Sequence, residues 1–102
     1  MGSPAFQPDL PYRQNPQVAL RPEPFGALAY HFGTRRLSFL KSRRLVEVVE
    51  QLADHGSVDE ALGACQVADR QRPSYLRALA SLAQAEMIVR RQPLSERDEE
   101  SP

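Results

Sequence analysis

The residues whose types could support catalysis lie where a helix would face water. Glu47, Glu50 and Asp54 share one side of a predicted helix, a spacing that could pair carboxylates for general acid–base work. They lie opposite the apolar stripe of that helix, where charged side chains simply face solvent. The two histidines, His31 and His55, fall in no cluster of ligand types with the spacing of a metal site. We therefore expect neither a catalytic site nor a metal site.

The other common catalytic signatures are missing from the sequence. No serine lies in a G-x-S-x-G motif, and the five glycines form no phosphate-binding loop. The single cysteine, Cys65, can form neither an internal disulfide nor a thiolate metal cage, and its type is most often a small buried apolar residue. The sequence thus predicts a protein that is not an enzyme and has no cofactor.

A basic run around an apolar centre is the feature best suited to binding. Five cations fall within ten residues and no acid lies among them: Arg35, Arg36, Lys41, Arg43 and Arg44. They bracket Leu37, Phe39 and Leu40, a centre that a solvated charge run would lack. On one interpretation the charges only discourage edge-to-edge aggregation of an ordinary strand. On the other, an open strand edge accepts an extended, partly acidic peptide by strand addition.

Three predicted strands position this run. Residues 18–20 form a short edge strand that the following prolines close. Residues 27–32 alternate larger with smaller side chains at the period of two of a strand with one buried face. A turn at residues 33–34 then leads into residues 35–41, the hairpin partner of the preceding strand.

Three predicted helices follow the strands. The first begins at the N-cap Ser42 and ends near Gly56. The second begins at Ser57, with Glu60 reaching back as in a capping box, and the third begins at Pro73. The apolar side of the third helix contains Leu76, Leu79, Ala80, Ala83 and Met87. Strands followed by helices predict an α+β fold, in which helices cover one face of a three-stranded antiparallel sheet, like a winged helix with its sheet first.

Length and composition predict one domain between two polar ends. The chain has 102 residues, 41% hydrophobic and 25% charged, which allows one core. We expect a disordered proline-rich arm over residues 1–15, a folded domain over 16–92 and a disordered acidic tail over 93–102. No secretory or membrane-spanning run of apolar residues is present, so we expect a cytoplasmic protein.

One segment of the chain resembles a known family. Residues 18–42, VALRPEPFGALAYHFGTRRLSFLKS, are similar to the mycofactocin maturation chaperones, and the resemblance continues through the third helix to near Arg91. That family belongs to the PqqD-like domains, which recognise the precursors of ribosomally synthesised and modified peptides. The resemblance implies a winged, three-stranded and three-helix fold, and it covers about three quarters of the chain.

The resemblance also implies a function and a site. The guest would be the leader of the mycofactocin precursor peptide, bound between the third strand and the third helix. The second partner would be a radical S-adenosylmethionine (radical SAM) maturase, which decarboxylates the terminal tyrosine of the precursor, links it to the preceding valine and holds the iron–sulfur chemistry. The implied peptide-binding positions are Arg35, Arg36, Leu37, Ser38, Phe39, Leu40 and Lys41 on the strand, and Tyr75, Leu76, Leu79 and Ala83 on the helix.

The alternative is a winged-helix DNA-binding regulator, which the order of elements permits. The third helix then offers mainly Arg77 and Gln84 to read bases, and the sequence pI of 6.7 is low for a DNA-binding domain. The basic run also precedes the first helix and does not lie on the third. We therefore expect peptide and maturase as partners, and neither nucleic acid nor membrane.

Overall fold

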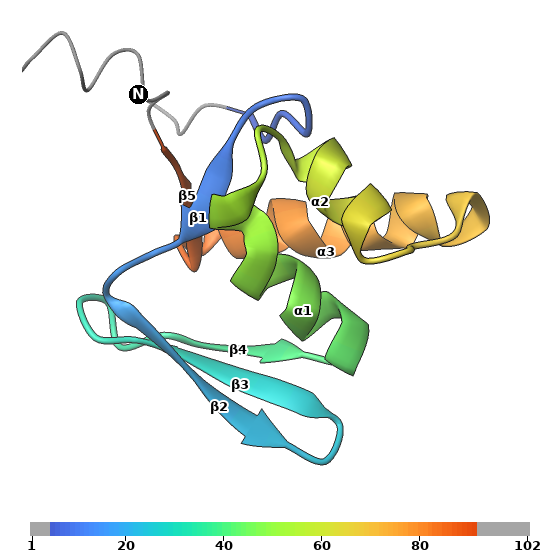
Figure 1. The fold of residues 1–102 in the computed structure, drawn as a ribbon. Coiled ribbons are helices and arrows are strands. Elements are labelled where there is room, and N and C mark those ends of the chain that lie inside the picture. Colours follow the sequence, from blue (N-terminus) through green and yellow to red (C-terminus); the bar gives the residue numbers. More distant parts are fainter. Residues whose placement is uncertain (1–4, 92–102) are drawn as a thin grey trace, which may run out of the picture.

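The computed structural model describes residues 5–91, which form two antiparallel sheets and three α-helices (Figure 1). The strands are β1 (Tyr12–Gln14), β2 (Val18–Glu23), β3 (Gly26–His31), β4 (Leu37–Leu40) and β5 (Ile88–Arg90). The helices are α1 (Arg43–Gln51), α2 (Val58–Ala64) and α3 (Arg72–Gln84), with short 3₁₀ turns at Leu52–Asp54 and Asp69–Gln71. Within this part of the chain the predicted α+β class, a three-stranded antiparallel sheet ahead of three helices, is confirmed.

The larger sheet has the order β2-β3-β4, so β3 is its central strand. Leu28 of β3 lies opposite Phe39 of β4, and Tyr30 lies opposite Leu37. The edge strand β2 is longer than predicted, because it continues through Pro22 to Glu23. A proline is tolerated there because an edge strand has one side that needs no amide donor.

The buried face of the sheet is the one with the smaller side chains. Ala27, Ala29 and His31 are buried, whereas Leu28 and Tyr30 lie on the opposite face and are half-buried. The predicted alternation along β3 is therefore confirmed, and the structure adds which set of side chains is covered. Helix α1 packs on this face (Figure 1), and small residues allow the helix to approach the strand closely.

Two backbone positions in the hairpins have positive φ. Gly26, with φ of 152°, lies so close to the end of β4 that a Cβ would fall 2.1 Å from the Leu40 carbonyl oxygen. The second is Arg35, with φ of 64°, which follows the predicted turn between β3 and β4. Its N–H donates to the His31 carbonyl at 2.7 Å, while the His31 N–H donates to the Arg36 carbonyl at 3.0 Å. Arg35 thus forms a bulge at a position that favours glycine.

The His31 side chain holds this turn from inside the protein. Its Nδ1 accepts hydrogen bonds from the N–H groups of Gly33 and Thr34, both at 3.0 Å. On the other side of the ring, Nε2 lies 3.3 Å from Asn15 Nδ2 and 4.0 Å from a Glu86 carboxylate oxygen. Because the ring is buried and its Nδ1 is occupied by backbone donors, His31 has a structural role.

Serine caps begin the first two helices, as the sequence predicts. Ser42 Oγ accepts the Leu45 N–H at 3.0 Å, and Ser57 Oγ accepts the Glu60 N–H at 3.1 Å. The Glu60 carboxylate reaches back as expected, but it accepts the N–H of Gly56, one residue before the cap, at 3.1 Å. Both helix starts therefore have acceptors for amides that lack a partner within the helix.

The N-terminal segment departs from the flexible arm expected over residues 1–15. Tyr12 is buried, and Arg13 of β1 lies opposite Val89 of β5. The Pro11 carbonyl accepts the Arg91 N–H at 3.2 Å. Composition does not show this order, because the backbone partners lie near the other end of the chain. Residues 1–4 and the predicted acidic tail over 93–102 lie outside the described residues.

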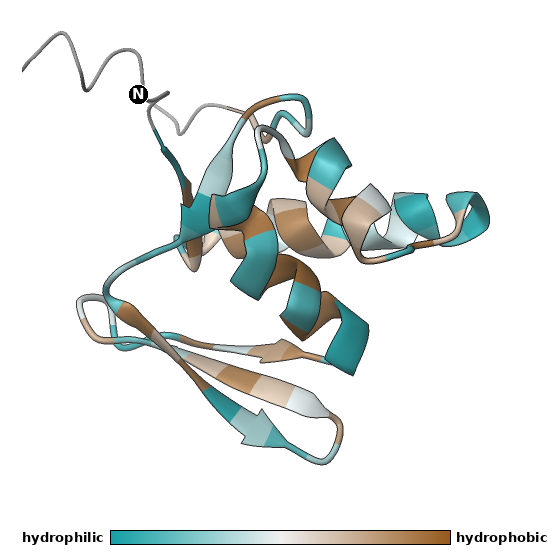
Figure 2. Ribbon diagram, in the orientation of Figure 1, coloured by the Kyte–Doolittle hydropathy of each residue, from teal (hydrophilic) through white to brown (hydrophobic). Residues whose placement is uncertain are grey.

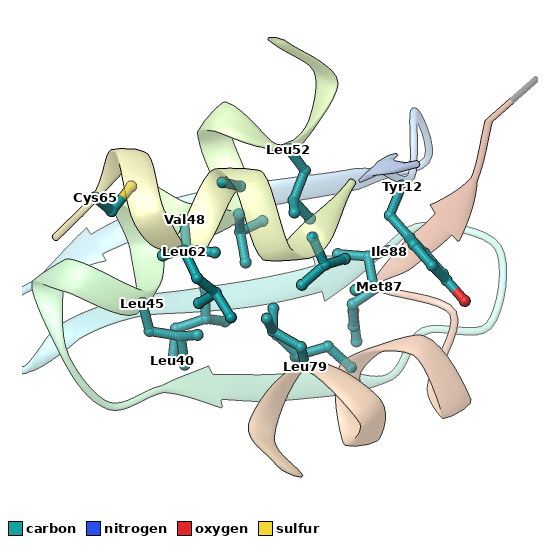
Figure 3. Packing of buried hydrophobic residues seen from close by; sticks show 14 of the residues in the cluster. Tyr12, Leu40, Leu45, Val48, Leu52, Leu62, Cys65, Leu79, Met87 and Ile88 are labelled. Carbon is teal, nitrogen blue, oxygen red and sulfur yellow. The ribbon is translucent and has the colours of Figure 1, made fainter. Parts of the chain in front are cut away.

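The core lies between the inner face of the larger sheet and the helices. Figure 3 shows Leu40 of β4 beside Leu45 of α1. The largest fully buried side chains include Leu40, Leu52, Leu62, Leu79, Met87 and Ile88. Hydrophobic stretches run along α1, α3 and β3, while the exposed turns of α1 and α2 are hydrophilic (Figure 2). None of the helices in residues 5–91 has the length and apolar composition of a membrane span.

Candidate functional site

A groove separates the edge of β4 from α3. Its larger part has a volume of about 430 Å³, and a smaller part has a volume of about 240 Å³. Lys41, Leu45 and Ala78 line both parts, so the two parts adjoin, and we call them together the channel. The other lining residues are Ser38, Phe39, Ser42, Ser74, Tyr75, Ser81 and Leu82. The channel therefore offers apolar walls with hydroxyl groups between them.

The edge of β4 beside this channel is open. Among residues 5–91, β4 pairs with β3 alone. The ladder begins with the bond between the His31 N–H and the Arg36 carbonyl. Bonded and non-bonded pairs alternate in an antiparallel ladder, so Leu37 and Phe39 direct their N–H and C=O groups away from β3. These groups are available to an added strand.

Most of the basic run is available for binding as well. All five of its cations are exposed and form no ion pair within the described part of the chain, and the side chains of Arg35, Arg36, Lys41 and Arg43 form no hydrogen bond there either. Arg44 has a different role, because its Nη1 donates to the carbonyls of Cys65 and Gln66 at 3.0 Å each. Arg44 thus neutralises the carbonyl end of α2.

The strand positions expected to contact a peptide divide into three kinds. Leu37 and Phe39 are 58% and 61% exposed and present large apolar side chains to solvent. Ser38 is half-buried and lines the channel. Leu40 is buried in the core, so its side chain supports the strand from behind.

Of the four expected helix positions, one lines the channel. Tyr75 lies in its smaller part. Leu79 is fully buried, and Leu76 and Ala83 are half-buried against the core outside both parts of the channel. The rest of the helix wall consists of residues outside those four positions: Ser74, Ala78, Ser81 and Leu82. The sequence does contain a signal for this wall, because Ser74, Ala78 and Ser81 recur at helical spacing and so lie on one face beside the apolar stripe.

The candidate chemical groups lie away from the channel or are unreactive. Glu47, Glu50 and Asp54 are exposed, as expected for a solvated helix face. Burial raises the pKa of the Cys65 thiol, the Glu47 carboxylate raises it further and Arg44 opposes the shift. A thiol with a raised pKa is a poor nucleophile near neutral pH. Residues 5–91 contain no group of three His, Cys, Asp or Glu side chains that could hold a metal ion.

Comparisons with known proteins identify the family. The model of the peptide chaperone MftB family matches residues 11–89. The peptide chaperone MftB of Mycolicibacterium smegmatis is 60% identical over 84 residues, which cover 82% of each chain. Those of Mycobacterium ulcerans and Mycobacterium tuberculosis are 54% and 53% identical, over 86% and 85% of this chain and 81% and 80% of theirs.

No solved structure matches the chain significantly. The relatives carry the name of a peptide chaperone, which is a non-catalytic role and agrees with the expectation that the protein is not an enzyme. The resemblance of residues 18–42 to the mycofactocin maturation chaperones is confirmed by the family match and by the relatives. The chain therefore belongs to the peptide chaperone MftB family.

Proposed function

We propose that this protein binds the leader of the mycofactocin precursor peptide and presents it, in the cytoplasm, to a radical SAM maturase. The observation that carries the proposal is the open edge of β4, which lies beside a channel walled by α3. Membership of the peptide chaperone family supports a peptide as the guest. Binding the leader and the maturase together would raise the effective concentration of the peptide at the enzyme.

The geometry defines the guest that fits. A strand added to β4 would bond to the free backbone groups of Leu37 and Phe39. Alternate guest side chains would then enter the channel, against Leu45, Ala78 and Leu82, while the others would lie beside Leu37 and Phe39. The exposed cations around β4 favour carboxylates in the guest. The fitting peptide is extended, apolar at alternate positions and partly acidic.

Apolar contacts and backbone bonds should dominate the affinity. An exposed ion pair contributes about 0.2 to 1 kcal/mol, because water and salt screen it. A backbone hydrogen bond contributes about 0.5 to 1.5 kcal/mol net, and the channel and the exposed Phe39 add apolar area. The arginines therefore steer the encounter and set the register of the guest.

Removing one amide from the open edge tests strand addition directly. Leu37→Pro deletes an N–H that points away from β3, at the first residue of a strand, where proline is tolerated. Leu37→Ala is the matched control, because it shortens the same side chain and keeps the amide. In calorimetric titration with the synthetic leader, we expect the proline variant to bind about 2- to 10-fold more weakly than the alanine variant. Equal affinities would contradict strand addition at β4.

Filling the channel tests the second part of the site. Ala78 is half-buried and lines both parts of the channel, so Ala78→Leu should obstruct the guest side chains. Ala64→Leu makes the same change on the exposed end of α2. We expect the first variant to weaken leader binding at least tenfold and the second to leave it unchanged. Failure of the wild-type protein to bind the leader would contradict the proposed function itself.

The DNA-binding alternative has no observation in its favour. The exposed cations cluster around β4 and at the start of α1, whereas α3 carries one exposed cation, Arg77, besides its channel wall and core stripe. A mobility-shift titration with duplex DNA at moderate salt should show no complex, and a tight complex would revive this alternative.

A further inference from the structure

The outer face of the larger sheet, on the side away from the helices, carries an uncovered apolar patch. Within residues 5–91 the exposed large hydrophobic side chains are Phe25, Phe32, Leu37 and Phe39, between 45% and 61% exposed. All three helices lie on the other side of this sheet, and no element of residues 5–91 covers the outer side (Figure 1). We call this patch, with Leu28 and Tyr30 between its members, the outer face.

The members of the outer face are contiguous. The rings of Phe25 and Phe39 meet edge-to-face at 5.9 Å, and Leu28 lies opposite Phe39 across the ladder. The rings of Tyr30 and Phe32 meet edge-to-face at 5.2 Å. The four exposed side chains together present roughly 450 Å² to solvent, taking about 200 Å² for each. A patch of that size on a single chain commonly marks an interaction surface.

The charge around the outer face has one sign. Residues 18–41 contain four cations, Arg21, Arg35, Arg36 and Lys41, and a single acid, Glu23. The Glu23 carboxylate is already bonded to Arg21 at 2.9 Å. A partner that covers the apolar patch would therefore gain from carboxylates around its own apolar centre.

A second copy of this chain fits the outer face poorly. Two copies placed face to face would bury roughly 900 Å² of this patch in total, below the roughly 1,200 Å² of a stable interface. They would also bring the cations of one sheet toward those of the other, a repulsion that the single paired acid cannot offset.

We infer that the outer face docks a second folded protein whose surface is apolar at the centre and acidic at the rim. If the proposed function holds, this partner is the maturase, and the identity of the partner rests on that proposal. Phe39 lines the channel and also belongs to the outer face, so the two surfaces adjoin. A leader strand on β4 would therefore emerge beside the docked partner.

The test uses variants far from the channel. Phe32→Ser removes apolar area at the hairpin turn, and Arg21→Glu reverses a charge on β2, the strand at the opposite edge from β4. Both side chains are exposed, and thermal unfolding checks that each variant is folded. Arg70→Glu, at an exposed position before α3, is the matched charge control. The full chain is titrated by calorimetry first with the synthetic leader and then with purified maturase.

We expect Phe32→Ser and Arg21→Glu to bind the leader within about twofold of wild type and the maturase at least tenfold more weakly, while Arg70→Glu matches wild type in both. Unchanged maturase binding in both variants would overturn the inference. The inference would also be overturned if sedimentation showed that wild type is a dimer and that either variant is a monomer. Binding of wild type to anionic vesicles, lost in either variant, would overturn it as well. If wild type binds the maturase through this face but not the leader, the proposed function fails and the outer face stands.

Discussion

Replacing Phe39 should reveal how much of leader binding is apolar. This side chain is 61% exposed, so about 120 Å² of a phenylalanine surface of about 200 Å² remains to be covered by a guest. If the guest covers half of it, Phe39→Ala removes about 1.5 kcal/mol at 25 cal/mol per Å². That loss corresponds to a roughly tenfold larger dissociation constant. Arg35→Ala removes one exposed charge, worth about 0.2 to 1 kcal/mol, and should weaken binding by about five-fold at most.

The assay for this comparison is calorimetric titration of each variant with the synthetic leader at two salt concentrations. Circular dichroism first checks that both variants are folded at the temperature of the titration. The Arg35→Ala difference should shrink in high salt, because exposed charges are screened, whereas the Phe39→Ala difference should persist. A larger loss for Arg35→Ala than for Phe39→Ala, or equal losses, would refute the assignment of apolar contact to β4.

Three further predictions concern stability. Arg35→Gly should raise the melting temperature by several degrees, because glycine relieves roughly 1 kcal/mol of strain at positive φ; an unchanged value would contradict the bulge. His31→Leu should lower the free energy of unfolding in urea by about 2 to 4 kcal/mol, since two backbone amides lose their acceptor. His31→Asn should lose less of the free energy of unfolding, because asparagine can accept hydrogen bonds from the same amides as in an Asx turn. Equal losses in the two variants would refute the role of His31 as an acceptor for these amides. Folding raises the pKa of the Cys65 thiol above its ordinary 9.0. The stability that the neutral thiol contributes is therefore fully present below pH 9 and is lost as the pH rises further. Cys65→Ala should therefore show a flatter fall of stability above pH 9, and parallel curves would contradict the raised pKa.

Features set by neighbouring residues could be predicted from the sequence. The caps at Ser42 and Ser57 are examples, because each side chain bonds an amide three positions away. The hairpin of β3 and β4 is another, since its turn and its alternation lie in one short segment. Such features depend on local geometry, which residue type and spacing describe well.

Features set by distant contacts could not be predicted. Alternation along β3 shows that one face is covered but not which one, and helix α1 covers the alanine face. Leu79 of α3 was expected to contact the guest, but its side chain is fully buried in the core. The channel wall lies one step further around the helix, at Ala78 and Leu82, and only the placement of α3 beside β4 gives it meaning.

The pairing of β1 with β5 has a consequence for how the chain folds during synthesis. Arg13 pairs with Val89, and Asn15 Nδ2 donates to the Glu86 carbonyl, 71 residues further along. Tyr12 therefore has no strand partner until nearly the last described residue has left the ribosome, several seconds later at ordinary rates of synthesis. Closing so long a loop is entropically costly and slow, so the larger sheet and α1 can form first. The open edge of β4 would then form on the nascent chain before β1 pairs with β5.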